Sequence, residues 1–115
     1  MDRDLIIETV NSLFIATDEH DWKALHTHHQ IGNHIVRLQN DEADVFCYGT
    51  ATHYLKNEPQ KNLWTVVGSH DFHLKKSRDR WKISRMKFNL KYMDGNTDLP
   101  KIAQKRMTKE IGANS

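Results

Sequence analysis

The stretch 43-ADVFCYGTATHYL-55 decides the fold, because its side chains sort into two faces by strict alternation. One face carries Ala43, Val45, Cys47, Gly49, Ala51 and His53, and the other carries Asp44, Phe46, Tyr48, Thr50, Thr52 and Tyr54. A period of two over this length is typical of a β-strand. We therefore predict a long strand over 43–55.

The same period of two extends to both sides of this strand. It predicts strands over 33–40, 63–75 and 81–93, with a turn at Asn40-Asp41-Glu42 and a polar loop over 56–62. In the strand over 63–75, one face carries Trp64, Val66, Gly68, His70, Phe72 and Leu74.

The last strand changes parity within its length. Trp81 and Ile83 lie on one parity, whereas the other parity holds Met86, Phe88, Leu90 and Tyr92. Such a switch predicts a β-bulge near Ser84 and Arg85.

The residues ahead of the strands follow a helical period instead. Apolar residues spaced by one, three and four predict an amphipathic helix over 2–16, namely Leu5, Ile6, Val10, Leu13 and Phe14. A second, shorter helix is predicted over 18–26, where Trp22 and Leu25 are three apart. Asp18 then lies at the end of the first helix or in the turn between the two.

Helices followed by an antiparallel meander indicate an α+β protein. We expect one domain over 1–115, with 97–115 as a frayed or helical tail. Four long strands, one of them bulged, predict a strongly curved sheet with the N-terminal helices on its concave face. A sheet of that shape can enclose a pocket.

Composition excludes several classes of partner. The net charge of +2 is mild and no Lys/Arg-rich run is interleaved with aromatic residues, so we expect no nucleic acid. No apolar run approaches the length of a membrane span, so we expect no membrane partner. Cys47 is the only cysteine, which precludes an intrachain disulfide and fits a reducing compartment. The N-terminus lacks a signal-peptide pattern, and we expect a cytoplasmic protein.

Five segments together resemble one known family. They are TDEHDWKAL (17–25), THHQIGNH (27–34), YGTATHYL (48–55), WTVVGSHDFHL (64–74) and RWKISRMKFNLKYMDGN (80–96). Their order and spacing resemble the SnoaL-like group of the nuclear-transport-factor-2-like superfamily, whose relatives include polyketide cyclases, scytalone dehydratase and hexachlorocyclohexane dehydrochlorinase. The resemblance implies a cone-shaped, cystatin-like fold around a pocket for a small-molecule ligand or substrate.

The chain departs from that family at the His26–Thr27 peptide bond, where relatives carry a further strand and helix. Either the chain is naturally abridged there, or a stretch of residues is missing from the sequence between these two positions. We favour the second interpretation, because a cone without an edge strand and a lid helix would expose its core face and its sheet edge.

The resemblance also implies a catalytic pair, which falls on Asp18 and His29. A neutral histidine is a good base near pH 7, and a carboxylate on its other N–H fixes the tautomer and stabilises the imidazolium. The alternatives stay open: Asp18 could cap the helix that follows it, and His29 could be a strand-end histidine bonded to backbone.

The remaining machinery of scytalone dehydratase is incomplete in this chain. Thr17 stands at the place of the first of its two tyrosines, and the second would belong to the absent segment. No histidine stands at the place of its second histidine, although His70 lies further along the same face and could partly substitute. The residues of this chain match the simpler His–Asp pair of the dehydrochlorinase better than the full set of scytalone dehydratase.

Small and apolar residues of the inward faces are candidates for the pocket lining. We place there Thr17, Cys47, Gly49, Ala51, Val66, His70, Met86 and Phe88. Ordinary core packing under a helix is the alternative for each of them.

The histidine-rich stretch 26-HTHHQIGNH-34 raises the question of a metal site. On a strand, His26, His28 and His34 share a parity and His29 faces the other way, so the four do not converge. We expect no metal and no organic cofactor.

These observations favour a cofactor-independent lyase or isomerase that acts on a hydrophobic cyclic substrate, with His29 as base and Asp18 as its partner. The alternative is a non-catalytic ligand-binding or oligomerisation module on the same fold. Phe46, Tyr48 and Tyr54 lie on the outer face, where a partner subunit could cover them, and we expect a homo-oligomer, a dimer or a trimer.

Overall fold

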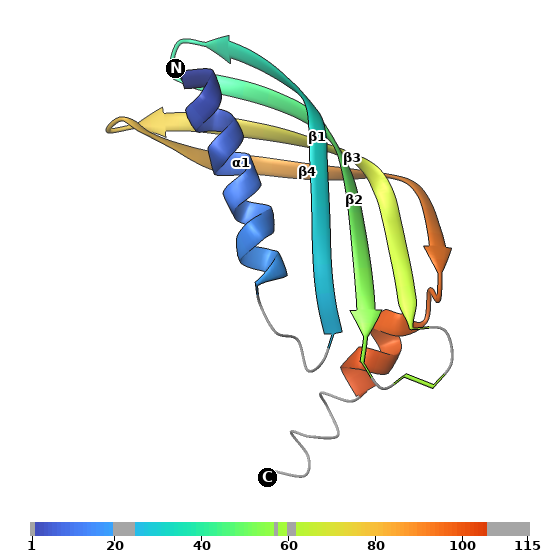
Figure 1. Cartoon of the computed structure of the whole chain (residues 1–115). Coiled ribbons are helices and arrows are strands. Elements are labelled where there is room, and N and C mark those ends of the chain that lie inside the picture. Colours follow the sequence, from blue (N-terminus) through green and yellow to red (C-terminus); the bar gives the residue numbers. More distant parts are fainter. Residues whose placement is uncertain (1, 20–24, 57, 60–61, 106–115) are drawn as a thin grey trace.

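The computed structural model describes residues 2–19, 25–56, 58–59 and 62–105. A long helix lies against one side of a sharply bent sheet, and a short helix lies at the far end of that sheet (Figure 1). The elements are α1 (Asp2–Asp18), β1 (Leu25–Gln39), β2 (Glu42–Leu55), β3 (Leu63–Ser77) and β4 (Arg80–Gly95), followed by a helical segment over residues 99–105.

The sheet is a simple meander in the order β1-β2-β3-β4, and each strand is antiparallel to its neighbour. The predicted α+β class and the curved antiparallel sheet are confirmed. We call the face that contacts α1 the concave face and the opposite one the outer face. The predicted inward faces of the strands over 43–55 and 63–75 are both on the concave face.

One stripe of α1 supplies the cover for the core. Ile6, Val10 and Phe14 are four residues apart, so they lie on one side of the helix, and all three are buried. Beneath them the sheet contributes Ala43, Val45, Cys47, Phe72, Leu74 and Trp81. The helix predicted over 2–16 is therefore confirmed, and it extends to Asp18.

β1 begins earlier than the strand predicted over 33–40. It starts at Leu25, and Leu25, Thr27 and His29 are less exposed than the alternating His26 and His28. The helix predicted over 18–26 is thus wrong at its C-terminal end, and its centre, with Trp22, lies outside the described residues. The spacing of three that suggested a helix does not persist, because the backbone at Leu25 already pairs with β2.

β1 also passes without interruption through the His26–Thr27 peptide bond. His26 pairs with Tyr54 and Thr27 with His53 in an unbroken register.

Bulges bend the strands where the sheet curves. His73 pairs with Arg85 and Leu74 with Ile83, which leaves Ser84 unpaired. The bulge predicted near Ser84 and Arg85 is confirmed.

A further bulge in β4 was not apparent from the sequence. Val67 pairs with Tyr92 but Gly68 pairs with Leu90, so the alternation shifts between them. As a result Met93, which pairs with Val66, lies on the concave face. The sequence predicted that Tyr92 lies on the same face as Leu90, and this prediction is wrong. Each bulge increases the local twist and bends its strand.

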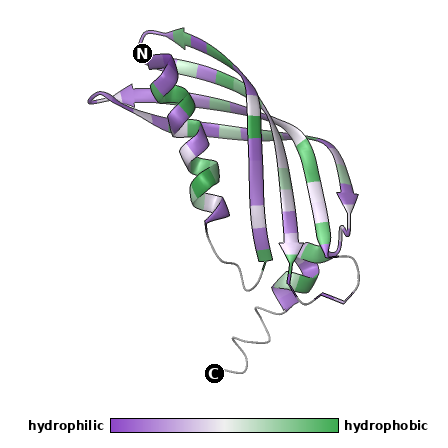
Figure 2. Cartoon of the chain, viewed as in Figure 1, coloured by the Kyte–Doolittle hydropathy of each residue, from purple (hydrophilic) through white to green (hydrophobic). Residues whose placement is uncertain are grey.

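Polar and apolar residues alternate along the strands (Figure 2). On β4 this leaves an apolar stripe that α1 does not cover. It consists of Met86 (59% exposed), Phe88 (41%), Leu90 (54%) and Met93 (44%). The concave face is thus filled at one end and open along this edge.

The end of the sheet away from the α1 core has its own small cluster. Leu55, Leu99 and Ala103 are buried together, with Leu25 and Trp64 packed against them. Part of the predicted tail is therefore a helix folded onto the sheet, and residues 106–115 lie outside the described part. Within the described residues, no helix is long and apolar enough to span a bilayer.

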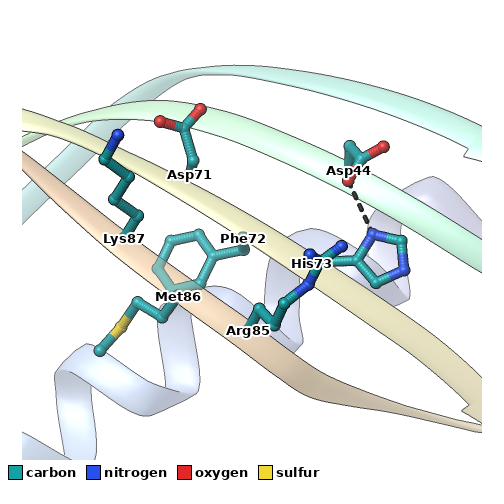
Figure 3. A pocket seen from close by; sticks show the side chains of 7 residues that line it. All are labelled: Asp44, Asp71, Phe72, His73, Arg85, Met86 and Lys87. Carbon is teal, nitrogen blue, oxygen red and sulfur yellow. Dashed lines mark hydrogen bonds and ion pairs between the residues drawn. The ribbon is translucent and has the colours of Figure 1, made fainter.

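The outer face carries a histidine held between two carboxylates. His73 Nδ1 lies 2.7 Å from Asp44 Oδ1, and Nε2 lies 2.9 Å from Glu42 Oε1. These hydrogen bonds raise the pKa of His73, and the bond to His73 lowers that of Glu42. Figure 3 shows the Asp44 contact among the residues that line a hollow of about 480 Å³, with Asp71, Arg85 and Lys87 nearby.

The helix stripe can be tested by truncation. We expect Ile6→Ala to lower the free energy of unfolding by about 2–5 kcal/mol, because a fully buried side chain leaves a cavity. Ile15→Ala is the matched control: Ile15 is 59% exposed, so its effect should stay within about 0.5 kcal/mol. Urea denaturation measures both, and equal losses would contradict the packing described.

The His73 contacts predict a dependence of stability on pH. A raised pKa means that the stabilisation is complete below the ordinary pKa of 6.5 and is lost as pH rises through the folded-state value. The lowered pKa of Glu42 means that its share is present above 4.5 and lost as pH falls. His73→Gln should therefore lose stability relative to wild type near pH 6, and the difference should shrink toward pH 9. Urea denaturation across this range measures it, and a constant difference would refute the assignment.

Candidate active site

A cavity of about 220 Å³ opens on the concave face beyond the core. Its lining residues are His29, Gly49, Ala51, His53, Trp64, Val66, His70 and Phe88. They come from all four strands, so the cavity exists only in the complete sheet.

Cross-strand pairing arranges these residues in rows. His29, Ala51 and Val66 form one row across β1, β2 and β3. On one side of it, His53 and Trp64 form the next row. The small side chain of Ala51 leaves space in the middle of the cavity. The rings of His53 and Trp64 lie at one end of it, and those of His70 and Phe88 lie at the other.

The pair of Asp18 and His29 is the polar centre of this arrangement. Asp18 Oδ1 lies 2.6 Å from His29 Nδ1, and Asp18 Oδ2 accepts the backbone N–H of His29 at 2.7 Å. Both side chains are mostly buried, with 15% exposure for His29 and 17% for Asp18. Two bonds from one carboxylate fix both the position and the rotation of the ring.

This geometry assigns the tautomer of His29. An ionised carboxylate only accepts hydrogen bonds, so the Nδ1 that faces Asp18 carries the proton. Nε2 is then the ring nitrogen with a free lone pair, which can accept a proton from a ligand. The carboxylate of Asp18 is therefore committed to His29, whereas the alternative suggested by the sequence was a cap for a following helix.

Phe14 belongs to the same site, one helical turn before Asp18. Its ring centroid lies 4.9 Å from that of His29 and 4.9 Å from that of His70. The end of α1 thus supplies both the carboxylate and an aromatic ring that packs against two of the lining histidines. The sequence indicated Phe14 only as a core residue of the helix.

His70 is the most deeply buried polar side chain of the site, at 8% exposure. Its ring contacts Phe14, Phe72 and Phe88, with centroids 4.8 to 5.7 Å away. Burial, with a smaller contribution from His29, lowers its pKa, so the ring is neutral at pH 7. Its Nδ1 is buried without a hydrogen-bond partner in the described part of the chain.

Gly49 makes the position of the His70 ring possible. A Cβ at Gly49 would lie 2.5 Å from His70 Nε2 and 3.1 Å from Ile31 Cδ1. The ring therefore lies directly over the glycine backbone. Any side chain at this position would push it away.

His53 and Trp64 form the opposite end of the cavity. Their rings stack with centroids 4.3 Å apart, and Thr27 Oγ1 lies 3.0 Å from His53 Nδ1. Burial and the nearby His29 lower the pKa of His53, which keeps it neutral. The sequence placed His53 and Trp64 on inward strand faces but did not include them, or Thr27, in the predicted site. The same alternation of side chains that identified Ala51 and Val66 could have identified His53 and Trp64 as lining residues.

Five of the eight predicted pocket residues line this cavity, namely Gly49, Ala51, Val66, His70 and Phe88. Thr17 does not, because it is exposed and its hydroxyl donates to the Leu13 carbonyl at 2.9 Å. Cys47 lies in the core under α1, where burial raises its pKa to about 11. Met86 pairs with Phe72, one row beyond Phe88, and lines the hollow of Figure 3 instead.

The histidine-rich stretch is divided by the fold. His26 and His28 are exposed, and His29 lines the cavity. A bulge between Gly32 and Ile35 shifts the alternation, so the shared parity predicted for His34 is wrong. His34 is partly buried, and burial, with a smaller effect of Arg3, lowers its pKa. Among the described residues, no group of three or more His, Cys, Asp or Glu side chains is arranged to hold a metal ion.

Comparisons with known proteins identify a family model and several solved structures of similar fold. Residues 1–87 match a family model described as the SnoaL-like domain, and no curated protein matches the chain. A solved protein from Kribbella flavida is 29% identical, with a TM-score of 0.56 over 64% of this chain and 52% of its own. A proposed aromatic ring hydroxylase from Novosphingobium aromaticivorans has a TM-score of 0.69 at 17% identity, over 84% of this chain and 94% of its own.

A third structure is a type 2 hexachlorocyclohexane dehydrochlorinase. Its TM-score is 0.57 at 14% identity, over 75% of this chain and 57% of its own. This chain therefore spans about half the length of the Kribbella protein and of the dehydrochlorinase. At the lower identities the likeness shows a shared fold.

The close approach at Gly49 can be tested with two glycines. Gly49→Ala should lower the free energy of unfolding by about 1–3 kcal/mol and shift the NMR signals of the His70 ring, because that ring is enclosed and must move. Gly32→Ala is the control, since a Cβ there meets no atom within 4 Å. Equal effects of the two substitutions would contradict the placement of His70.

Proposed function

Because the chain belongs to the SnoaL-like domain family, we propose that it is a small-molecule lyase or isomerase in which His29 removes a proton from carbon. The observation that carries this proposal is the double hydrogen bond from Asp18 to His29 at the wall of the cavity. The enzyme would need neither metal nor organic cofactor for this step.

The chemistry follows from the tautomer. His29 Nε2 accepts the proton, and the resulting imidazolium is stabilised by the carboxylate of Asp18. The pair of electrons left on carbon forms a double bond, either toward a neighbouring carbonyl as an enolate or toward a carbon that loses a leaving group. Elimination, isomerisation and aldol-type cyclisation all begin with this step.

The cavity favours an uncharged substrate of one or two rings. Among the described residues that line it, none is Lys, Arg, Asp or Glu, and His53 and His70 are neutral. A volume of about 220 Å³ is small for a ligand site, so the substrate would also extend over the uncovered stripe of β4. These properties support a hydrophobic cyclic hydroxy or carbonyl compound.

The comparisons support the proposal only in part. The dehydrochlorinase carries a name that denotes an elimination, whereas the Novosphingobium protein is described as a hydroxylase on the same fold. Fold alone therefore does not fix the reaction. A non-catalytic ligand-binding or oligomerisation module remains the alternative, which the experiment below distinguishes.

We extend the proposal to assembly and location. The outer face exposes Tyr48 (51%) and Tyr54 (40%), and Phe46 packs edge-on against Tyr48 with centroids 5.6 Å apart. Aromatic side chains on an open sheet face suit a subunit interface, which supports a dimer or a trimer. A single buried cysteine is compatible with the cytoplasm.

Proton exchange from a simple ketone tests the base. We expect the wild-type protein to catalyse deuterium incorporation from D₂O next to the carbonyl of cyclohexenone, measured by NMR. His29→Ala should lower the rate at least about 100-fold, since it removes the base, and Asp18→Asn should lower it as well. His28→Ala is the matched control, because this neighbour is exposed on the outer face, and its rate should equal that of wild type.

Two results would contradict the proposal. The first is exchange that His29→Ala leaves unchanged. The second is binding of cyclohexenone in the cavity, seen by chemical-shift changes at Val66, without any catalysed exchange. The latter result would favour the ligand-binding module.

A further inference from the structure

Three histidines line one small cavity, but among the described residues only His29 of these three has a carboxylate partner. His53 is bonded to the Thr27 hydroxyl, and His70 makes no hydrogen bond through Nδ1 with any described residue. A polar ring this deeply buried is costly unless its polar atoms find partners. The sealed Nδ1 cannot meet a ligand, so a partner that arrives with the ligand meets the other ring nitrogen.

The environment of His70 determines which nitrogen can meet that partner. Nδ1 is sealed from solvent, and a buried N–H without an acceptor is rarer than a bare acceptor. The proton of the neutral ring therefore belongs on Nε2. That atom lies over Gly49, and both residues line the cavity, so its N–H is a donor at the cavity wall.

His70 and His29 both pack against Phe14, each with its ring centroid 4.9 Å from that of the phenyl ring. His29 comes from β1 and His70 from β3, so a ring placed over Ala51, beside the His70 ring that covers Gly49, would lie between the two histidines. One histidine has an oriented lone pair and the other a neutral N–H. Proton removal from carbon requires both groups, because the base takes the proton at one atom while negative charge develops at another atom of the substrate.

We propose that His70 is a second catalytic residue, whose Nε2–H donates a hydrogen bond to the substrate oxygen that becomes negative when His29 removes the proton. This inference rests on the proposed function and narrows the substrate class. The substrate would be an uncharged cyclic compound with an oxygen acceptor conjugated to the carbon acid, or an oxygen leaving group opposite to it.

The step balances without any other reagent. The proton moves from carbon to His29 Nε2, and the former C–H electron pair forms the new π bond. The electrons displaced by that bond end on oxygen, either as an enolate or as a departing alkoxide or phenoxide. His70 keeps its proton and stabilises the oxygen by hydrogen bonding, and Asp18 balances the imidazolium of His29.

A benzisoxazole elimination can test both histidines without knowledge of the natural substrate. In nitrobenzisoxazole a base takes the C–H proton, the pair of electrons forms the nitrile, and the N–O bond breaks so that oxygen leaves as a phenoxide. The compound is uncharged and bicyclic, and the release of phenoxide is followed by absorbance. A series with other ring substituents varies the basicity of the leaving oxygen.

We expect His70→Phe to lower kcat/KM about 10- to 100-fold for nitrobenzisoxazole, because one donor to the developing oxyanion is lost. The loss should grow as the leaving oxygen becomes more basic, which steepens the dependence of rate on leaving-group pKa. His70→Gln, which can present an N–H near the position of Nε2, should recover part of the rate and the shallower dependence. His28→Phe, the same substitution on the outer face, should match wild type.

The outcomes separate the two proposals. If His29→Ala abolishes turnover but His70→Phe leaves both rate and leaving-group dependence unchanged, the role of His70 is refuted and the base remains. If wild type shows no turnover that depends on His29, both proposals fail. Should His70→Phe not fold, judged by circular dichroism, the comparison of His70→Gln with His70→Asn decides, because Asn presents its N–H near Nδ1 instead. Equal rates for those two variants would overturn the inference.

Discussion

The structure depends on one constraint: the concave face of the sheet is lined by apolar side chains, and α1 is too narrow to cover all of it. Where Ile6 and Val10 lie over the sheet, the concave face is filled and the core is complete. Beyond Phe14 the inward side chains of β2 become small, and the space that results is the cavity. The rest of the concave face, along β4, remains exposed. Core, cavity and open stripe are thus three consequences of the same narrow cover.

The charge of the histidines that line the cavity depends on which of them contact a carboxylate. Asp18 is the one that bonds a lining histidine in the described structure, and it uses both oxygens on His29. The other two histidines are buried without such a partner, so burial and the neighbouring His29 keep them neutral. Chemically identical side chains can therefore take different roles, because one of them has a carboxylate partner among the described residues and the other two do not.

Much of the sheet could be predicted from the sequence, because period-two alternation is a property of the strand itself. The inward faces of β2 and β3 were correct for that reason. The start of β1 was missed because His26 and His28 give little contrast in hydrophobicity with Thr27 and His29. The bulge at Lys91 was hidden because Leu90 and Tyr92 are both apolar and fit an uninterrupted strand.

The site was only partly predictable, and for a different reason. Asp18 and His29 are eleven residues apart and on different elements, so a resemblance to a family, rather than their spacing, suggested the pair. A helical pattern indicates Phe14 as a core residue, and only the position of the helix end shows that its ring also packs against His29 and His70. That position has a mechanical consequence. Because Phe14 and Asp18 are one turn apart on the same helix, a displacement of the end of α1 would move the aromatic ring away from His29 and His70 and the carboxylate away from His29 at the same time. The packing around the base and the hydrogen bond that orients it therefore depend on the same helix end.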